Sequence, residues 1–293
     1  MKPTGLHLLL TYQCTFECDH CFVWGSPRQG GTMTLATIRR ILDQGKAAGT
    51  VRTIFFEGGE PFLYYGTLLE GVRLAAGMGF EAGIVSNVYW ATSAEDALAC
   101  LRPFAGLLHG MTISTDLFHY SERISRQAQH AQAAAQTLGI EMGTISVARP
   151  SDGARLSGEG GVMFRGRAAA KLAAQAPQQP WQSFTACPHE KLDAPGRLHV
   201  DAFGNLHICQ GISVGNLLAA PLADISASYA PAKHPIVGPL LRGGPAELVR
   251  RYDVPHAETY ADACHLCYEA RQALRGRFPD VLAPDQMYGA PGA

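Results

Sequence analysis

Apolar positions in the first half of the chain alternate between short runs, typical of buried strands, and stretches with the spacing of a helix. The first strand is expected at residues 6–10. It is followed by an expected helix that Thr32 or Thr34 could cap and that ends near Gly49. The other expected strands are 51–56, 82–85, 111–113, 142–147 and 162–164, and the other expected helices are 68–75, 94–101 and 121–138. Because strands that alternate with helices form βαβ units, we expect an α/β protein with a partial (β/α)6 TIM-like barrel at residues 1–175.

The pattern changes at the Pro- and Gln-rich residues 175–180, which we interpret as a linker. Beyond them, two apolar runs at 198–200 and 206–208 flank a turn that contains Gly204 and Asn205, and together they predict a β-hairpin. We therefore expect a second domain at residues 176–293 that contains this hairpin.

Unusual sequences follow the expected strands at their C-terminal ends, the edge of a parallel α/β fold that carries reactive residues. Three cysteines within eight residues follow the first strand: Cys14, Cys18 and Cys21. The later strands are followed by Gly58-Gly59-Glu60, Ser86-Asn87, Ser114 and Asp116, and Arg167. Three more polar residues lie on or next to this rim without an assigned catalytic step: Glu57, His119 and Tyr120.

The three clustered cysteines indicate a metal or iron–sulfur site, because thiolates are ligands for both. A four-iron cluster held by Cys14, Cys18 and Cys21 would keep one iron without a protein ligand, open to a substrate or cofactor. The alternative is zinc, which normally takes four ligands, and His20 or Asp19 could supply the fourth. Buried thiols without a metal are the third interpretation.

Four of the remaining cysteines lie in the C-terminal third: Cys187, Cys209, Cys264 and Cys267. Four cysteines that converge can close a complete site, either for one iron–sulfur cluster or for a structural zinc. The eighth cysteine, Cys100, falls on an expected helix, and we interpret it as a buried thiol.

The 293 residues can hold one large domain, or one domain with a smaller one, and 47% of them are hydrophobic, which is ordinary for a globular protein. The net charge of −1, without long runs of one sign, argues against nucleic acid and against a membrane surface as partners. No apolar stretch approaches the roughly 18 residues of a membrane span, and the N-terminus has no signal-peptide pattern. We therefore expect a soluble, cytoplasmic protein with reduced thiols.

The pairing of Cys14-x3-Cys18-x2-Cys21 with Gly58-Gly59-Glu60-Pro61 closely resembles the radical S-adenosylmethionine (SAM) superfamily. The C-terminal third resembles the SPASM/twitch extension of these enzymes through Cys187, Gly204-x4-Cys209, Gly215-Asn216-Leu217 and Cys264-x2-Cys267. A double-cluster SPASM domain needs more thiols than this chain has outside the first motif. The resemblance therefore implies a twitch-like form with one auxiliary [4Fe-4S] cluster.

The resemblance also implies roles for individual residues. Cys14, Cys18 and Cys21 would ligate a [4Fe-4S] cluster whose open iron binds SAM. Gly58, Gly59 and Glu60 would hold the methionine amino group of SAM. Ser114, Asp116 and Asn87 would bond its ribose or its sulfonium end. Arg167 would pair with its carboxylate. The plain structural alternatives are a strand–helix turn for the glycines, a helix cap for Ser114 and a surface cation for Arg167. His20 stands where the superfamily more often has an aromatic residue, so the adenine contacts are unassigned.

The activity implied by the resemblance is reductive cleavage of SAM to a 5′-deoxyadenosyl radical that takes a hydrogen atom from the substrate. A peptide or protein is the expected substrate, as for maturases of ribosomally made peptides. The alternatives are a small molecule or nucleoside, or a non-catalytic iron–sulfur or zinc protein. The expected partners include a one-electron reductant of the flavodoxin or ferredoxin type. Because few residues precede the first strand, a peptide is expected to need a separate recognition protein or direct docking.

Overall fold

An eight-stranded, mostly parallel sheet organises the molecule, which we describe from a computed structural model over residues 1–122, 124–152 and 158–290. The strands lie in the order β5-β4-β3-β2-β1-β7-β8-β9. Their bounds are β1 Gly5–Thr11, β2 Thr53–Gly58, β3 Glu81–Ser86, β4 Leu108–Ser114, β5 Met142–Ile145, β7 Arg197–Val200, β8 Asn205–Cys209 and β9 Ile212–Asn216. A separate two-stranded ribbon joins β6 (Gln179–Pro180) to β10 (Thr259–Tyr260).

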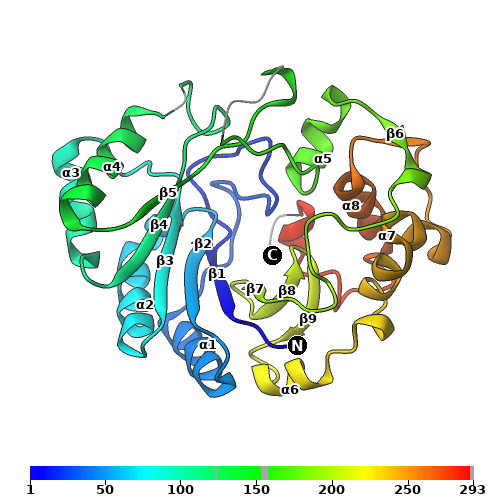
Figure 1. The fold of residues 1–293 in the computed structure, drawn as a ribbon, viewed down its shortest axis with the longest axis horizontal. Coiled ribbons are helices and arrows are strands. Elements are labelled where there is room, and N and C mark those ends of the chain that lie inside the picture. The colour runs from blue at the N-terminus through cyan, green and yellow to red at the C-terminus, as the bar shows by residue number, and fades with distance from the viewer. Residues whose placement is uncertain (123, 153–157, 291–293) are drawn as a thin grey trace.

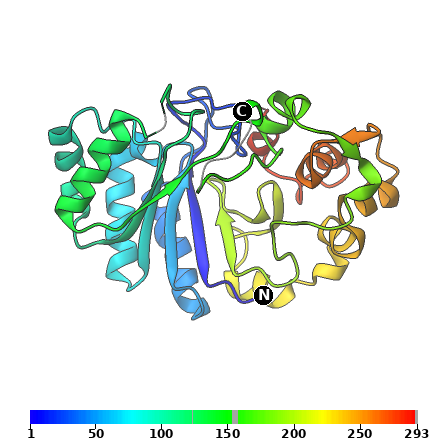
Figure 2. The ribbon, with the colours of Figure 1, turned by 45° about the horizontal axis from the view of Figure 1, so that its top comes forward.

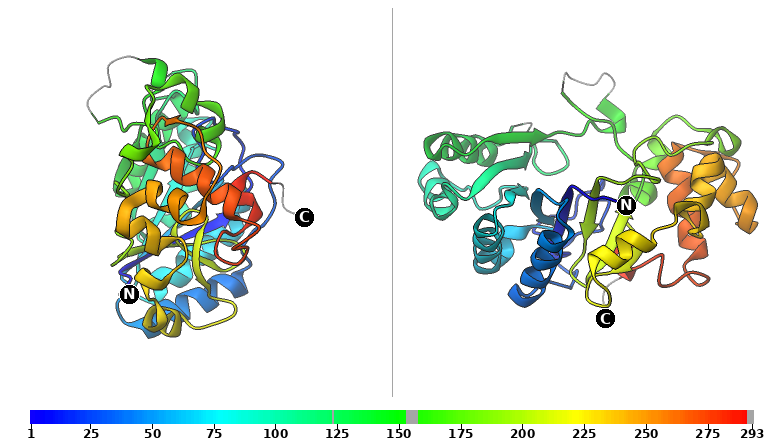
Figure 3. Two further views of the ribbon diagram at one scale, coloured as in Figure 1. Left: turned by 90° about the vertical axis from the view of Figure 1, so that its right-hand side faces the viewer. Right: turned by 60° about the horizontal axis from the view of Figure 1, so that its bottom comes forward.

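Helices cover this sheet from the outside (Figure 1). Those of the first half are α1 Leu35–Ala48, α2 Tyr65–Gly77, α3 Ala94–Leu101 and α4 Arg126–Leu138. Those of the second half are α5 Arg167–Lys171, α6 Leu222–Ser228, α7 Val237–Tyr252 and α8 Ala263–Leu274. Figure 3 shows α7 and α8 at the opposite end of the molecule from α3 and α4. No helix in the described ranges is both long and apolar enough to cross a membrane.

The βαβ alternation expected from the sequence is confirmed for the first five strands, and local signals explain the helix ends. Thr34 caps α1 by accepting a hydrogen bond from the backbone N–H of Thr37, and Gly49 ends the helix in the left-handed conformation. The leucines of β1 that face the helices are fully buried. On β2, Phe56 packs against Gly71 of α2, where a Cβ would lie 2.9 Å from the aromatic ring.

The expected sixth strand at 162–164 is wrong, because these residues form no strand in the described part of the chain. The backbone bends there, with Arg165 N–H donating to the Met163 carbonyl at 2.7 Å. Phe164 buries its ring in a small cluster with Ala168 and Leu172 instead of extending the sheet. The sixth parallel strand is β7, which pairs with the opposite edge of β1.

The hairpin expected in the C-terminal third is confirmed as β7 and β8, which pair antiparallel, and β9 extends it. Because β7 is hydrogen-bonded to β1, one sheet runs through both of the expected domains. The boundary at 175/176 stays a prediction. Figure 2 shows the segment between β1 and α1, in dark blue, above the C-terminal end of β1 and next to α5.

Candidate functional site

The three cysteines after β1 share a loop whose backbone amides point at sulfur. Phe16 N–H donates to Sγ of Cys14 at 3.4 Å, and Gly25 N–H donates to Sγ of Cys21 at 3.2 Å. The Cys21 N–H also donates to the Cys18 carbonyl at 3.1 Å, which tightens the loop. Amide hydrogen bonds to sulfur are a feature of iron–sulfur ligation, so the loop fits a cluster.

Electrostatics around these thiols favour a bound cation. Burial raises the pKa of Cys14 to about 12, and the negative charges of Glu60 and Cys21 add to this. Burial also raises the pKa of Cys18, with further increases from Cys21 and Cys14. The three sulfurs are therefore close enough to oppose one another's ionisation. A metal centre would supply the positive charge that makes them thiolates.

The glycines after β2 let two backbone segments meet. Gly58 has a φ of 139°, and a Cβ there would lie 2.4 Å from the Thr11 carbonyl oxygen. A Cβ on Gly59 would lie 2.1 Å from the carbonyl oxygen of Gln13. Gly59 N–H instead donates to the Thr11 carbonyl at 2.7 Å, and Glu60 N–H donates to the Gln13 carbonyl at 2.9 Å. The glycines thus fasten the cysteine loop to the end of β2.

Glu60 is fully buried, and its carboxylate bonds protein groups. Oε1 accepts from Phe62 N–H and from the Ser86 hydroxyl, while Oε2 accepts from Asn87 N–H at 2.8 Å. Burial raises the pKa of Glu60 to about 7, although these three donors oppose the rise. In the structure, Glu60 therefore joins the ends of β2 and β3. The side chain of Asn87 reaches the cysteine loop, with Nδ2 at 3.1 Å from the Thr15 hydroxyl.

Two buried polar side chains meet between the end of β4 and the cysteine loop, with Oδ2 of Asp116 at 3.8 Å from Nε2 of His20. Asp116 uses Oδ1 to accept from Phe118 N–H and to contact His119, and its Oδ2 meets no hydrogen-bond partner within the described ranges. His20 stacks on Phe118 with 4.3 Å between ring centroids, and its buried Nδ1 has no partner among the described residues either. Burial lowers the pKa of His20 to about 4. Such orphaned atoms fit a polar ligand. Ser114, at the buried end of β4, lies two residues before Asp116.

Arg167 binds the cysteine loop directly. Its two terminal nitrogens donate to the carbonyl oxygens of Cys18 at 2.7 Å and Gly25 at 2.9 Å, and its side chain is buried. Its backbone N–H donates to the Cys21 carbonyl at 2.9 Å. The planar guanidinium therefore clamps both ends of the loop. The structure thus brings the sequence-predicted residues on β2, β3, β4 and α5 to the cysteine loop.

A second group of four cysteines lines one pocket formed by the C-terminal third: Cys187, Cys209, Cys264 and Cys267. Two buried arginines, Arg165 and Arg271, share its walls, and Nη1 of Arg165 donates to Sγ of Cys209 at 3.2 Å. Burial raises the pKa of Cys267 to about 11, against the charge of Arg271. Cys100, in contrast, lies on α3.

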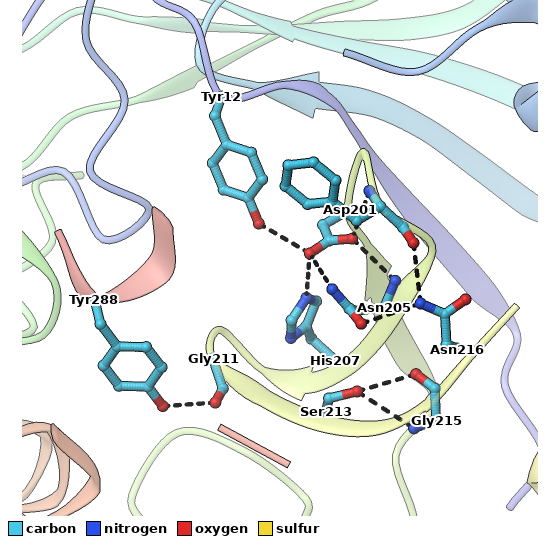
Figure 4. A network of polar contacts seen from close by, with 10 residues as sticks. Tyr12, Asp201, Asn205, His207, Gly211, Ser213, Gly215, Asn216 and Tyr288 are labelled. Carbon is cyan, nitrogen blue, oxygen red and sulfur yellow. Dashed lines mark hydrogen bonds and ion pairs between the residues drawn. The ribbon is translucent and has the colours of Figure 1, made fainter. Parts of the chain in front are cut away.

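A buried polar network ties this C-terminal part to β1 (Figure 4). Oδ2 of Asp201 accepts from the Tyr12 hydroxyl at 3.1 Å and from the Asn205 side chain, and it contacts Nε2 of His207 at 3.2 Å. Burial would raise the pKa of Asp201, but the contacts of His207 and Asn205 hold it below its ordinary value. Trp24 adds a second tie, with Nε1 donating to the Tyr268 hydroxyl at 2.7 Å.

Sequence reasoning missed the two arginines beside the second cysteine group and the Asp201 network. A signal for Asp201 existed, because an aspartate that begins a hairpin turn often accepts backbone N–H groups within that turn. Its Oδ1 accepts from Phe203 N–H and Asn205 N–H, both at 2.9 Å. No comparable local signal marks Arg165, which lies far from Cys209 in the chain.

Comparison with known proteins identifies the first part of the chain. Residues 8–133 match the model of the radical SAM superfamily, so this part is a radical SAM domain. The "Putative peptide biosynthesis protein YydG" of Bacillus subtilis (strain 168) is 29% identical over 111 residues, which are 38% of this chain and 35% of that protein. An "S-adenosylmethionine-dependent nucleotide dehydratase" of Fibrobacter sp. (strain UWH6) is 25% identical over 159 residues, which are 51% of this chain and 45% of that protein.

The α/β fold also matches a solved structure of BtrN in complex with AdoMet and 2-DOIA. That match has a TM-score of 0.52 at 16% identity and covers 76% of this chain and 81% of BtrN. Both curated relatives are matched over less than half of their own length, so the likeness concerns part of each protein.

Proposed function

We propose that this protein is a radical SAM enzyme whose catalytic [4Fe-4S] cluster is held by Cys14, Cys18 and Cys21. The observation that carries the proposal is the cysteine loop, with amide N–H groups aimed at two of its sulfurs and with Gly58 and Gly59 fastened against its backbone. The radical SAM domain match over residues 8–133 supports it. When bound, the cluster and SAM supply one-electron cleavage of SAM, which provides a 5′-deoxyadenosyl radical for hydrogen abstraction.

The surrounding residues position this chemistry. Arg167 donates to two carbonyls of the cysteine loop, so we assign it the role of fixing the shape of this loop. We also assign it the pairing with the SAM carboxylate. Asp116 offers the ribose hydroxyls its buried Oδ2, which lies 3.8 Å from Nε2 of His20 and has no hydrogen-bond partner within the described residues. The side chain of Asn87 reaches the cysteine loop, and Ser114 lies two residues before Asp116. Glu60 organises the rim where Gly58 and Gly59 would receive the methionine amino group. Of the three thiols, Cys18 is buried and Cys14 and Cys21 are half-buried, which limits the access of water to the cluster side.

We assign an auxiliary [4Fe-4S] cluster to the second cysteine group, within a SPASM/twitch-like domain at residues 176–293. Four thiolates around such a cluster carry excess negative charge, and a pocket with two buried arginines offsets it. The Arg165 contact to Sγ of Cys209 is the kind of hydrogen bond that tunes a cluster's reduction potential. A zinc ion held by four thiolates carries the same excess negative charge as an oxidised four-iron cluster, so sulfide analysis separates the two.

A peptide is the substrate class that we favour, because a relative at 29% identity is named for peptide biosynthesis. A small molecule or nucleotide is the second candidate, because another relative is named a nucleotide dehydratase. In both cases a one-electron reductant of flavodoxin or ferredoxin type would feed the catalytic cluster, and a separate protein would present a peptide. Coexpression with candidate precursor peptides, followed by peptide mass analysis, separates these two substrate classes.

The proposed activity is tested with anaerobically reconstituted protein, SAM and dithionite. We expect methionine and 5′-deoxyadenosine from the wild type, and about eight irons and eight sulfides per chain from two four-iron clusters. Cys18→Ser should abolish 5′-deoxyadenosine and remove about half of the iron. Cys100→Ser is the matched control and should keep both. Zinc without sulfide, or product formation by Cys18→Ser, would contradict the proposal.

A further inference from the structure

Three side chains form a polar layer on neighbouring strands of the sheet. His7 of β1 pairs in register with Phe55 of β2 on one side and with His199 of β7 on the other. Glu57 lies two residues after Phe55 and therefore points to the same face of the sheet. The layer thus joins β2, β1 and β7, and no part of the proposed SAM chemistry uses it.

The donor atoms of this layer are spaced like the ligands of one metal ion. Nδ1 of His7 lies 3.0 Å from one Glu57 oxygen, and Nε2 of His199 lies 3.1 Å from the other. All three ligand atoms lie within 4.8 Å of one another. An ion with bonds of about 2.0–2.2 Å places neighbouring ligand atoms roughly 3.0–3.5 Å apart. Each of the two nitrogen–oxygen separations lies in this range, one to each oxygen of the carboxylate.

Hydrogen bonding alone leaves the layer badly paired. If Nε2 of His199 carries a proton for Glu57, that N–H faces Nε2 of Gln210 at 3.3 Å, which is also a donor. Oε1 of Gln210 is buried and has no partner in the described part of the chain. Turning the amide exchanges its oxygen and nitrogen, and then the buried nitrogen lacks an acceptor. A cation removes the clash between the two donors, because it takes the lone pair of Nε2 of His199 in place of a proton, together with lone pairs of His7 and of the carboxylate.

We propose that His7, Glu57 and His199 bind a divalent transition-metal ion of the zinc class. Two neutral imidazoles and one carboxylate suit Zn²⁺ and disfavour Mg²⁺ and Ca²⁺, which prefer all-oxygen sites. The side chains of His7 and Glu57 are 16% and 15% exposed, so the site remains reachable by solvent. Three protein ligands leave at least one coordination position for water or a substrate oxygen, as in catalytic zinc sites.

Burial and charge are consistent with this assignment. Burial lowers the pKa of His199, which favours the neutral, metal-binding form of its imidazole, against the attraction of Glu57. Burial would raise the pKa of Glu57, but the charge of His199 and the hydrogen bonds of both imidazoles bring it well below its ordinary value. The carboxylate is therefore ionised near neutral pH and able to ligate a cation.

The experiment loads the anaerobically reconstituted protein with Zn²⁺ alone, removes free metal by gel filtration and measures zinc against protein and sulfide. We expect about one zinc per chain in the wild type. His199→Gln and Glu57→Gln should lower its affinity at least tenfold, as loss of a metal contact does. His109→Gln, at an exposed histidine on β4, is the matched control and should leave zinc binding unchanged. The zinc measurement does not depend on SAM cleavage, so a failure of the zinc proposal can be distinguished from a failure of the proposed activity.

X-ray absorption at the zinc edge distinguishes the proposed site from zinc in the cysteine pockets. We expect nitrogen and oxygen scatterers at about 2.0 Å, with imidazole signals, and no sulfur at about 2.3 Å. Unchanged iron and sulfide in the variants would show that they fold. Sulfur scatterers, or a zinc content that His199→Gln and Glu57→Gln leave unchanged while they fold, would overturn the proposal. The layer would then be a hydrogen-bonded relay.

Discussion

Replacing Gly59 by alanine should detach the cysteine loop from the sheet. A Cβ at this position would lie 2.1 Å from the carbonyl oxygen of Gln13 and 2.5 Å from its carbonyl carbon. Both neighbours are backbone atoms, so no side chain can rotate out of the way. Either the end of β2 or the loop that leads into Cys14 must move by roughly 1 Å to reach ordinary contact distances.

The expected cost follows from the contacts that such a shift breaks. Two backbone hydrogen bonds join these segments, from Gly59 N–H to the Thr11 carbonyl and from Glu60 N–H to the Gln13 carbonyl. Each contributes about 1 kcal/mol, and overpacking costs roughly 1–3 kcal/mol more. We therefore expect Gly59→Ala to lower the free energy of unfolding by about 3–5 kcal/mol.

The assay measures chemical unfolding together with iron and sulfide content after anaerobic reconstitution. Gly59→Ala should lose mainly the iron of the first cluster, because the displaced backbone leads directly into Cys14. Gly66→Ala is the matched control, since a Cβ at this exposed position on α2 meets no atom within 4 Å. It should be neutral or slightly stabilising. A Gly59→Ala protein with unfolding within 0.5 kcal/mol of the wild type and full iron content would refute the reasoning.

The remaining predictions concern the ties around the two cysteine groups. Asp201→Asn should lower the free energy of unfolding by about 3 kcal/mol at pH 7, because it removes a buried charge from the groups paired with it. Asp224→Asn, at an exposed position on α6, is the control and should leave the free energy of unfolding unchanged. The pKa of Asp201 is lowered in the folded state, so the ionised carboxylate stabilises the fold above its unfolded pKa of about 3.9, and this stabilisation is lost as the pH falls. In urea unfolding at a series of pH values, the difference in unfolding free energy between wild type and Asp201→Asn should therefore shrink below about pH 4. Arg167→Lys should lower the iron content by about one cluster, because an ammonium cannot hold the Cys18 and Gly25 carbonyls as a planar fork; unchanged iron would contradict this role.

The elements that the sequence predicted correctly are those with local signals. The helix from Leu35 to Ala48 has a threonine cap, a terminal glycine and helical apolar spacing, and β1 and β2 have apolar runs. The expected strand at 162–164 has three suitable residues, but glycines precede them and the backbone bends at Arg165. Phe164 packs instead against Ala168 and Leu172, in and just after the short helix that follows, and the apolar run at 162–164 gives no sign of this contact.

The same distinction applies to the site. The spacing of Cys14, Cys18 and Cys21 is recognisable within one short stretch of sequence, and the structure shows amide donors around two of these sulfurs. The layer of His7, Glu57 and His199 depends on the register between β1 and β7, whose strands are separated by most of the chain. Pattern reasoning reports which face a residue occupies, but it gives no register between distant strands. Glu57 was therefore noted only as a polar residue near the rim.

The pairing of β7 with β1 gives the C-terminal third a direct mechanical connection to the first cysteine loop. β1 runs straight into Tyr12 and Cys14, and Tyr12 donates to Asp201 at the turn of the hairpin that ends on Cys209. Both tyrosine and carboxylate are fully buried, so the connection cannot exchange with water without opening the sheet. A displacement of the hairpin therefore acts on the backbone two residues before Cys14. Because occupation of the second cysteine pocket would fix Cys209, we expect the second pocket to stabilise the first loop even though neither group of cysteines contributes a ligand to the other.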